Sequence, residues 1–469
     1  MNRNLFCVCV TLFAWMAGCA HSPPPPPRGA LAPEAARTQY ESITPSLVAI
    51  EYVWESELGR HEIIGAGVVV GDDGLVMTPL ALLGDEIPDV QMKEFKIIVP
   101  RDNADPLELD AVFQGRDERN EVAFLKTKEP QQWKSIQFVE DPPQVGEVVY
   151  SVGLLPKEAG YKSYFMGGIV AASLRGEMPQ VVVNGGLAAV GSPVFNAQGH
   201  AIGLVTYQPG QSLLLNNEAE ALNAIVSPPK LFVPTRFFDQ SLGDLPTPGN
   251  PLKLPWIGVP QLTGLTKDVS EVFNLQDQPA IQVGDVIRDA PADRAGLKQG
   301  DIIVKLNGQP LERGDQPEEL PQIFRRKILR MKPGEQVVLS VLRRRGQPLQ
   351  DITITLSEQP PRANTAKRYF ADDLGFGVRE SVFVDTYARH LAADAKGVVV
   401  AVIRPQSSAE SGGLQFNDFI QRLNGDPVTD VAGFQTAYEQ LRKDKPKESV
   451  VLVVLREGRE DTIRIEPPQ

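Results

Sequence analysis

Short apolar runs broken by turn residues dominate the first half of the chain. Residues 65–78 hold two apolar segments on either side of Asp73-Gly74, a dipeptide typical of tight turns between paired strands. These segments lack the period of an amphipathic helix. Further short apolar segments follow at residues 121–126, 144–153 and 167–171. The pattern predicts a β-rich domain over residues 38–237, folded as a sandwich or a barrel.

The second half of the chain contains one module twice. Both copies carry Gly-Leu, then Asp, then Leu-Asn-Gly-x-Pro, and the Asn-Gly dipeptides predict tight turns between strands. A constant offset across several motifs indicates a duplication, which we place at residues 255–358 and 372–468. Residues 238–254 then form a linker, and the linker between the two copies contains residues 359–365. The equivalent pairs, each 117 positions apart, are Gly258 and Gly375, Leu297 and Leu414, Asp301 and Asp418, and Asn307 and Asn424.

The first residues are expected to form an export signal. Residues 1–18 contain the apolar run Leu5 to Ala17, which is too short for a membrane-spanning helix with proper flanks. Met16-Ala17-Gly18-Cys19 resembles the bacterial lipobox, which implies lipidation of Cys19; a plain signal peptide ending near Ala20 is the alternative. Residues 19–37, with prolines at 23–27, are expected to form a stiff, extended tether. Ala20 implies a lipoprotein of the outer membrane, facing the periplasm.

Composition excludes several classes of function. The formal net charge of −12 provides no basic excess for binding nucleic acid. All three cysteines, Cys7, Cys9 and Cys19, precede the folded part, so no disulfide or thiolate metal site is expected downstream. With only four histidines in 469 residues, we expect neither a metal site nor a cofactor.

Residues 184–203 identify the family. The run Ser192-Pro-Val-Phe-Asn-Ala-Gln-Gly-His-Ala-Ile-Gly203 resembles the second half of the nucleophile loop of trypsin-like serine proteases. Together with the hairpin at 65–78, Glu-Val-Ala-Phe-Leu-Lys at 121–126 and the repeated module, it resembles the HtrA (Deg) family. The resemblance implies a mainly β chain: a trypsin-like double six-stranded β-barrel, then two α+β PDZ domains. It also implies a homo-oligomer, a trimer by analogy.

The residues that would perform catalysis are missing from the family positions. By resemblance the base falls on Ala81, the carboxylate on Glu121 and the nucleophile on Val190. A serine protease needs a hydroxyl and an imidazole at two of these positions, so the site is expected to be inactive. Ser192 in a shifted register is the alternative nucleophile. His61 and His200 are the candidate bases, but neither follows the first hairpin, where the base belongs.

The repeated modules carry the expected binding function. By resemblance, the backbone of Ile257-Gly258-Val259 and of Leu374-Gly375-Phe376 captures the terminal carboxylate of a peptide, beside helices at about 318–331 and 431–441. Core strands are the alternative interpretation of these runs. We therefore expect a non-catalytic envelope lipoprotein that binds peptide segments or C-termini of envelope proteins, as scaffold, chaperone or regulator. The alternatives are an active endopeptidase built around Ser192, and a structural partner that co-assembles with an active relative.

Overall fold

A computed structural model describes residues 33–84, 87–101, 103–175, 178–206, 214–215, 225–248, 252–275, 278–314, 316–392 and 394–468. The predicted signal segment 1–18, the lipidation site Cys19 and most of the tether lie outside these residues. Helix α1 (Pro33–Ile43) takes in the last part of the predicted tether, which is therefore not extended there. Proline fits the first helical position, and the good helix formers Glu-Ala-Ala-Arg that follow it favour a helix. No described helix has the length and apolarity needed to cross a membrane.

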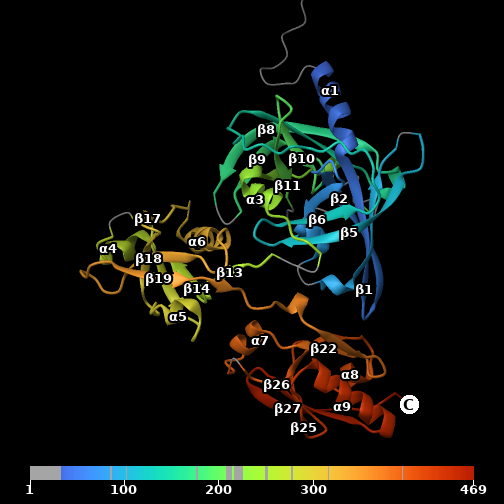
Figure 1. Ribbon diagram of the computed structural model, residues 1–469, viewed down its shortest axis with the longest axis vertical. Coiled ribbons are helices and arrows are strands. Elements are labelled where there is room, and N and C mark those ends of the chain that lie inside the picture. Colours follow the sequence, from blue (N-terminus) through green and yellow to red (C-terminus); the bar gives the residue numbers. More distant parts are fainter. Residues whose placement is uncertain are drawn as a thin grey trace, which may run out of the picture.

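Two closed six-stranded barrels form the first half of the described chain (Figure 1). All neighbouring strands for which a register is given pair antiparallel, and the Asp73-Gly74 turn joins β2 and β3 as predicted. The first barrel consists of β1 (Leu47–Ser56), β2 (Gly59–Val69), β3 (Leu75–Pro79), β4 (Met92–Val99), β5 (Leu107–Asp117) and β6 (Val122–Thr127). The second consists of β7 (Val148–Leu154), β8 (Ser163–Leu174), β9 (Gln180–Gly185), β10 (Pro193–Asn196), β11 (Ala201–Val205) and β12 (Leu231–Pro234).

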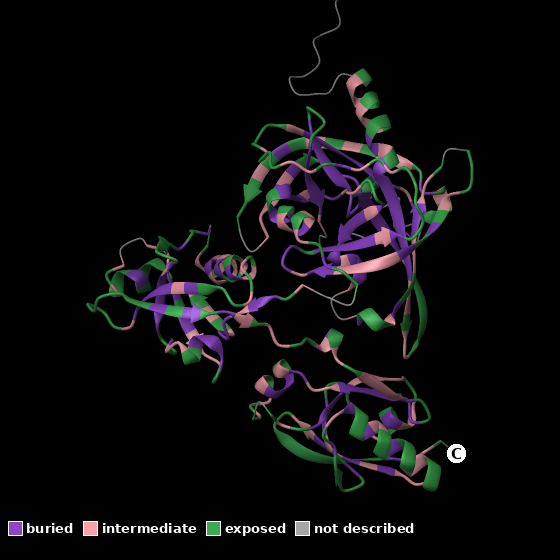
Figure 2. Ribbon diagram, viewed as in Figure 1, coloured by how far each residue is buried: buried purple, intermediate pink, exposed green. Residues whose placement is uncertain are grey.

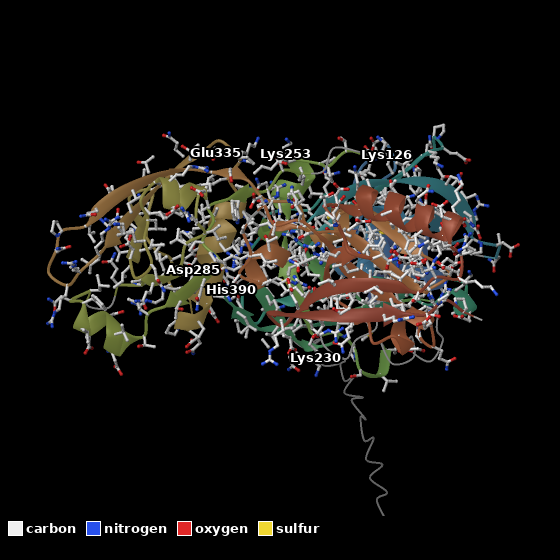
Figure 3. All side chains as sticks on the ribbon, turned by 90° about the horizontal axis from the view of Figure 1, so that it is seen from below. Lys126, Lys230, Lys253, Asp285, Glu335 and His390 are labelled. Carbon is white, nitrogen blue, oxygen red and sulfur yellow. The ribbon has the colours of Figure 1, made fainter. Side chains whose placement is uncertain are left out.

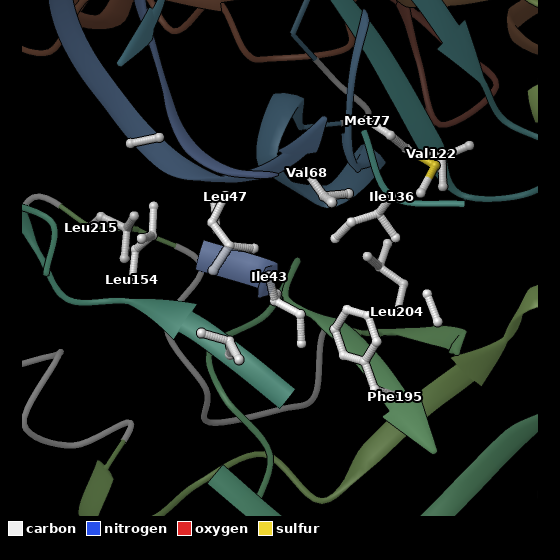
Figure 4. Close-up of a cluster of buried hydrophobic side chains, with 14 of the residues drawn as sticks. Ile43, Leu47, Val68, Met77, Val122, Ile136, Leu154, Phe195, Leu204 and Leu215 are labelled. Atoms are coloured by element: carbon white, nitrogen blue, oxygen red, sulfur yellow. The ribbon is translucent and has the colours of Figure 1, made fainter. Parts of the chain in front are cut away.

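A shared apolar core joins the two barrels. Figure 4 shows side chains of the first barrel, such as Val68 and Met77, facing Phe195 and Leu204 of the second. Ile43 at the end of α1 lies in the same cluster. Each fully buried side chain of this size contributes about 1.5–3 kcal/mol, so the barrels are expected to form one folding unit. Figure 2 shows the buried residues concentrated inside the barrels and along the sheets.

The start of the predicted linker at residues 238–254 is not a free linker. Helix α3 (Asp239–Gly243) packs against the barrels, and its Ser241 hydroxyl donates to the fully buried Asp117 across 2.9 Å. Arg119 donates to the same carboxylate across 2.8 Å. A buried carboxylate needs such partners, and satisfying Asp117 fixes this helix in place.

The two repeated modules each fold as an antiparallel sheet with helices. The Asn-Gly turns are as predicted: Asn307 and Gly308 both have positive φ, as do Asn424 and Gly425. The first module has β13 (Pro255–Trp256) paired with β20 (Ser357–Glu358), the order β14-β15-β16-β18-β19, and helices α4 (Lys267–Val272), α5 (Pro291–Arg294) and α6 (Leu320–Leu329). These strands are β14 (Gln261–Gly264), β15 (Ile281–Asp285), β16 (Ile302–Leu306), β18 (Gln336–Leu342) and β19 (Gln350–Thr355); β17 (Gln309–Pro310) pairs with β16.

The second module repeats this plan with one more long strand. Its order is β21-β22-β23-β24-β26-β27, and its helices are α7 (Phe383–Ala388), α8 (Ser408–Ser411) and α9 (Val431–Asp444). The predicted helices at 318–331 and 431–441 correspond to α6 and α9. The strands are β21 (Arg368–Ala371), β22 (Phe376–Glu380), β23 (Val398–Ile403), β24 (Phe419–Leu423), β26 (Val450–Arg456) and β27 (Arg459–Ile465), with β25 (Asp426–Pro427) paired to β24.

Specific contacts hold the modules against the barrels and each other. The Arg326 guanidinium of α6 lies 3.9 Å from the Phe237 ring centre, and Arg330 donates to the Arg236 carbonyl across 2.5 Å. Between the modules, the Tyr387 hydroxyl donates to Asp285. Figure 3 labels Asp285 of the first module and His390 of the second, which is three residues after Tyr387.

Candidate functional site

The loop that would carry the nucleophile lies between β9 and β10 and faces the first barrel. Val190, at the nucleophile position, is 3% exposed, and Gly191 has a φ of +91°. A Cβ on Gly191 would come within 3.0 Å of the Ala66 carbonyl oxygen and 3.1 Å of Pro79 Cδ. The loop therefore packs directly against the end of β3 and requires glycine at this residue.

The other two triad positions lie at the same end of β3. Ala81 is in the short 3₁₀ helix η2 (Leu80–Leu83) that follows Pro79. The Leu80 N–H donates to the Glu121 carbonyl across 2.8 Å, which joins the Ala81 and Glu121 loops. Glu121 is solvent-exposed and precedes β6. The fold thus brings Ala81, Glu121 and the Val190 loop together, and they offer a methyl group, a carboxylate and an isopropyl group.

Backbone donors near Val190 are already occupied by other side chains. In a trypsin-like site, the N–H groups of the nucleophile and of the residue two before it stabilise the oxyanion. Here the N–H of Ala188, two residues before Val190, donates to the Ser151 hydroxyl across 2.6 Å. The next N–H, of Ala189, donates to the Tyr164 hydroxyl across 2.8 Å. Burial raises the pKa of Tyr164 to about 12, so this hydroxyl stays protonated.

Ser192, the alternative nucleophile, lies inside the second barrel. Its side chain is 1% exposed, and its Oγ has no hydrogen-bond partner among the described residues. Its backbone is fixed on both sides, by its N–H to the Ala189 carbonyl across 3.0 Å and by its carbonyl to the Val205 N–H across 2.9 Å. A substrate carbonyl has no route to this hydroxyl without movement of the loop.

Neither candidate base is placed to activate a nucleophile. His61 is exposed on β2, with its ring centre 5.4 Å from that of Trp54. His200 is exposed in the turn between β10 and β11 and hydrogen-bonds through its backbone to Asn196. The fold places neither at the end of β3, where Ala81 lies.

The two predicted carboxylate-binding loops have the same backbone arrangement. Gly258 has a φ of +78° and Gly375 one of +74°. The Ile257 carbonyl accepts from Ala292 N–H across 2.9 Å, and its equivalent Leu374 accepts from Ala409 across 3.0 Å. Val259 leads into β14, and Phe376 begins β22. Each loop turns through a left-handed glycine, while its apolar side chains lie in the core of its module, as the core-strand alternative expects.

Sequence reasoning missed a cavity between the modules and the first barrel. It has a volume of about 690 Å³, and its walls include Trp54, Leu58, Trp256, Phe383 and Phe416. No motif could have indicated it, because the walls come from segments far apart in the chain. The Ser151 and Tyr164 contacts were missed for the same reason.

Comparison with protein families agrees with this architecture. Residues 65–204 match the model of the trypsin-like peptidase domain, and residues 261–356 and 373–466 each match that of the PDZ domain.

Curated relatives match over most of the chain. A protein of Brucella suis biovar 1 is 27% identical over 402 residues, covering 82% of this chain and 69% of its own length. One of Ectopseudomonas mendocina is 28% identical over 414 residues, covering 84% and 78%. Both are named "Probable periplasmic serine endoprotease DegP-like".

Solved structures show the same fold. The HtrA-type protease AlgW with a decapeptide has a TM-score of 0.52 at 19% identity, covering 70% of this chain and 99% of that one. The same protease with a tripeptide has a TM-score of 0.53 at 19% identity, covering 70% and 98%. The chain is thus composed of a trypsin-like peptidase domain followed by two PDZ domains, and it is similar over most of its length to proteins named DegP-like endoproteases.

Proposed function

We propose that this chain is a non-catalytic HtrA-like lipoprotein of the bacterial envelope that binds peptide segments or C-termini of other envelope proteins. In this role it acts as a scaffold, chaperone or regulator in protein quality control. The observation that carries the proposal is the meeting of Ala81, Glu121 and Val190 at one place. These side chains supply neither the hydroxyl nucleophile nor the imidazole base of a serine protease.

The size of the loss supports this reading. Removing a serine-protease triad costs on the order of 10⁶ in rate, or roughly 8 kcal/mol of transition-state stabilisation. Such an enzyme would keep some residual rate from its oxyanion donors. In this chain the Ala188 N–H already donates to the Ser151 hydroxyl, so part of that residual rate is lost as well.

Peptide binding is proposed for the PDZ loops. PDZ domains take an extended peptide as an added strand and capture its carboxylate with backbone N–H groups. Both solved AlgW structures named above contain a peptide. The periplasmic location named for the relatives, together with the export signal and Cys19, favours capture of envelope proteins. Assembly into trimers is proposed by analogy alone.

Cleavage assays test the proposal against its rival, an active endopeptidase that uses Ser192. Casein and fluorogenic peptides would be incubated with the full chain and with Ser192→Ala. We expect no cleavage by either protein. Cleavage that disappears in Ser192→Ala would overturn the proposal and indicate a site rebuilt around that hydroxyl.

A further inference from the structure

The strand that would receive a peptide in the second PDZ domain is already paired on both edges. β22 follows the Leu374-Gly375-Phe376 loop, and β23 pairs with one of its edges. Along its other edge runs β21, antiparallel, with Tyr369 opposite Val378 and Ala371 opposite Phe376. This second edge is the one where a PDZ ligand adds as a strand.

The carboxylate-binding loop is occupied as well. The Gly375 N–H, which would point at the terminal carboxylate of a ligand, donates to the Ala371 carbonyl across 2.8 Å. The last residue of β21 therefore presents its carbonyl oxygen where the end of a bound peptide would lie.

The side chains of β21 also occupy the positions that the side chains of a bound peptide would take. Ala371 is 1% exposed and lies in the core beside Leu374. Two residues earlier, the Tyr369 ring centre is 6.2 Å from that of Phe434 and 6.1 Å from that of Tyr438, both on the groove helix α9. Alternate residues of a strand face the same side, so these two fill the groove. Phe370 points the other way, with the Arg404 guanidinium 5.1 Å from its ring centre.

The turn that joins β21 to β22 is bound to the groove helix. Asp373 accepts a hydrogen bond from the Tyr438 hydroxyl across 2.5 Å and pairs with Arg442 across 2.8 Å. Both partners lie on α9. The hairpin is therefore fixed at its turn and along its strand.

The first PDZ domain lacks this arrangement. Its corresponding N-terminal segment, β13, pairs with β20, so β14 is the outer strand of its sheet. Among the described strands, β15 alone pairs with β14. The space beside the far end of β14 is narrow, since a Cβ on Gly264 would come within 1.8 Å of the Pro317 carbonyl oxygen.

We infer that residues 368–371 are an internal ligand that fills the peptide groove of the second PDZ domain. The proposed peptide capture, on which this assignment builds, is then confined to the first PDZ domain. The groove of the second fits a C-terminus with a small apolar last residue and an aromatic residue two positions before it. A free peptide must displace a strand tethered through a four-residue turn, whose effective concentration is about millimolar.

The test uses amide hydrogen exchange on the full chain, with and without the hexapeptide Ala-Lys-Arg-Tyr-Phe-Ala carrying a free carboxylate. This peptide has the sequence of residues 366–371. In the unaltered chain we expect the Gly375 amide to exchange on the order of 100-fold more slowly than in an unfolded chain. We expect the hexapeptide at about 100 μM, well below the effective concentration of the tethered strand, to leave the exchange of β22 and α9 unchanged.

Tyr369→Ala removes the ring that packs on α9 and should open the groove. We expect the hexapeptide to protect β22 and α9 in this variant and to bind it at least about tenfold more tightly than the unaltered second domain. Phe370→Ala is the matched control on the opposite face and should remain closed. Fast exchange of the Gly375 amide in the unaltered chain, or protection of β22 and α9 by the hexapeptide there, would overturn the inference.

Two readouts separate this inference from the proposed function. If no peptide protects β14 of the first PDZ domain, the proposed capture fails, while the Gly375 exchange still decides the internal ligand. If Tyr369→Ala unfolds the second PDZ domain, the exchange of Gly375 in the unaltered chain remains decisive.

Discussion

The Ala188 N–H donates to the Ser151 hydroxyl across 2.6 Å, inside the second barrel. This bond matters because it uses a donor that an active trypsin-like site would aim at the reacting carbonyl. The loss of chemistry in this chain therefore has two separable parts, the missing side chains and the occupied backbone.

Restoring the triad alone should restore proteolysis only in part. We expect Ala81→His combined with Glu121→Asp and Val190→Ser to stay about 10²–10³ below the rate on a fluorogenic peptide that an unoccupied oxyanion site would allow, because one oxyanion donor remains occupied. Adding Ser151→Ala and Tyr164→Phe should raise the rate by about 10²–10³. The variant with the other four changes but with Val190 kept is the control. Full activity from the first three changes would contradict this account.

Gly191 should tolerate no side chain. We expect Gly191→Ala to lower the free energy of unfolding of the barrels by about 1–3 kcal/mol, through its positive φ and its contact with Ala66. Gly199→Ala is a matched control, because its φ of +87° is similar but its nearest neighbour, Gln39 Nε2, would be 3.4 Å away. Urea unfolding followed by circular dichroism measures both. Equal losses of unfolding free energy in the two variants would mean that the contact of residue 191 with the first barrel adds nothing to the cost of the substitution.

The duplicated aspartates should differ in their effect on stability. Asp418 is 1% exposed and receives two hydrogen bonds of 2.7 Å from Arg456, whereas Arg343 lies 3.4 Å from Asp301. We expect Asp418→Ala to destabilise the second PDZ domain by about 3 kcal/mol, and Asp301→Ala to destabilise the first by less. Domain-resolved hydrogen exchange gives both values. A larger loss in the first domain would refute this ranking.

Acid should weaken the second PDZ domain through Asp385. Burial opposes its ionisation, but hydrogen bonds of 2.6 and 2.8 Å from Arg379 and one from the Val382 N–H outweigh burial and lower its pKa. Because the folded pKa lies below the unfolded one, this stability is fully present above about pH 4 and is lost as pH falls through the folded pKa.

Unfolding of the second PDZ domain between pH 7 and pH 2 would show this loss. Asp385→Asn should be less stable at pH 7 by about 3 kcal/mol and should show a flatter pH dependence. Asp426→Asn, at an exposed residue of β25, is the control and should follow the unaltered chain. An Asp385→Asn variant with the original pH dependence would assign the acid sensitivity to another group.

Local patterns were enough to predict much of the fold. The Asp73-Gly74 hairpin, the Asn307-Gly308 and Asn424-Gly425 turns and the equivalence of Gly258 with Gly375 depend on short stretches of chain, and the structure has each of them. The prediction of an extended chain at the end of the tether was wrong, because the helix preference of the residues after Pro33 outweighed the influence of the preceding prolines. The prediction of a free linker from residue 238 was wrong, because the Ser241 hydroxyl donates a hydrogen bond to the buried Asp117, more than 120 residues away.

The site was predictable only in part. Motif order placed Ala81, Glu121 and Val190, and the fold brings those segments together. The contact of Ser151 with Ala188 depends on how β7 lies beside the loop, which no local pattern specifies. The pairing of β21 with β22 was hidden for a different reason. Residues 368–371 are an ordinary apolar segment, and the equivalent part of the first PDZ domain pairs elsewhere.

The cavity between the first barrel and the second PDZ domain has an optical consequence. Two of the chain's four tryptophans, Trp54 and Trp256, line it, one from the barrel and one from the first PDZ domain. Phe383 of the second PDZ domain faces Trp256 with ring centres 5.5 Å apart. Any swing of the second PDZ domain away from the barrel would bring these indoles into water and shift their emission to the red. The molecule carries its own reporter of domain opening, with no added dye.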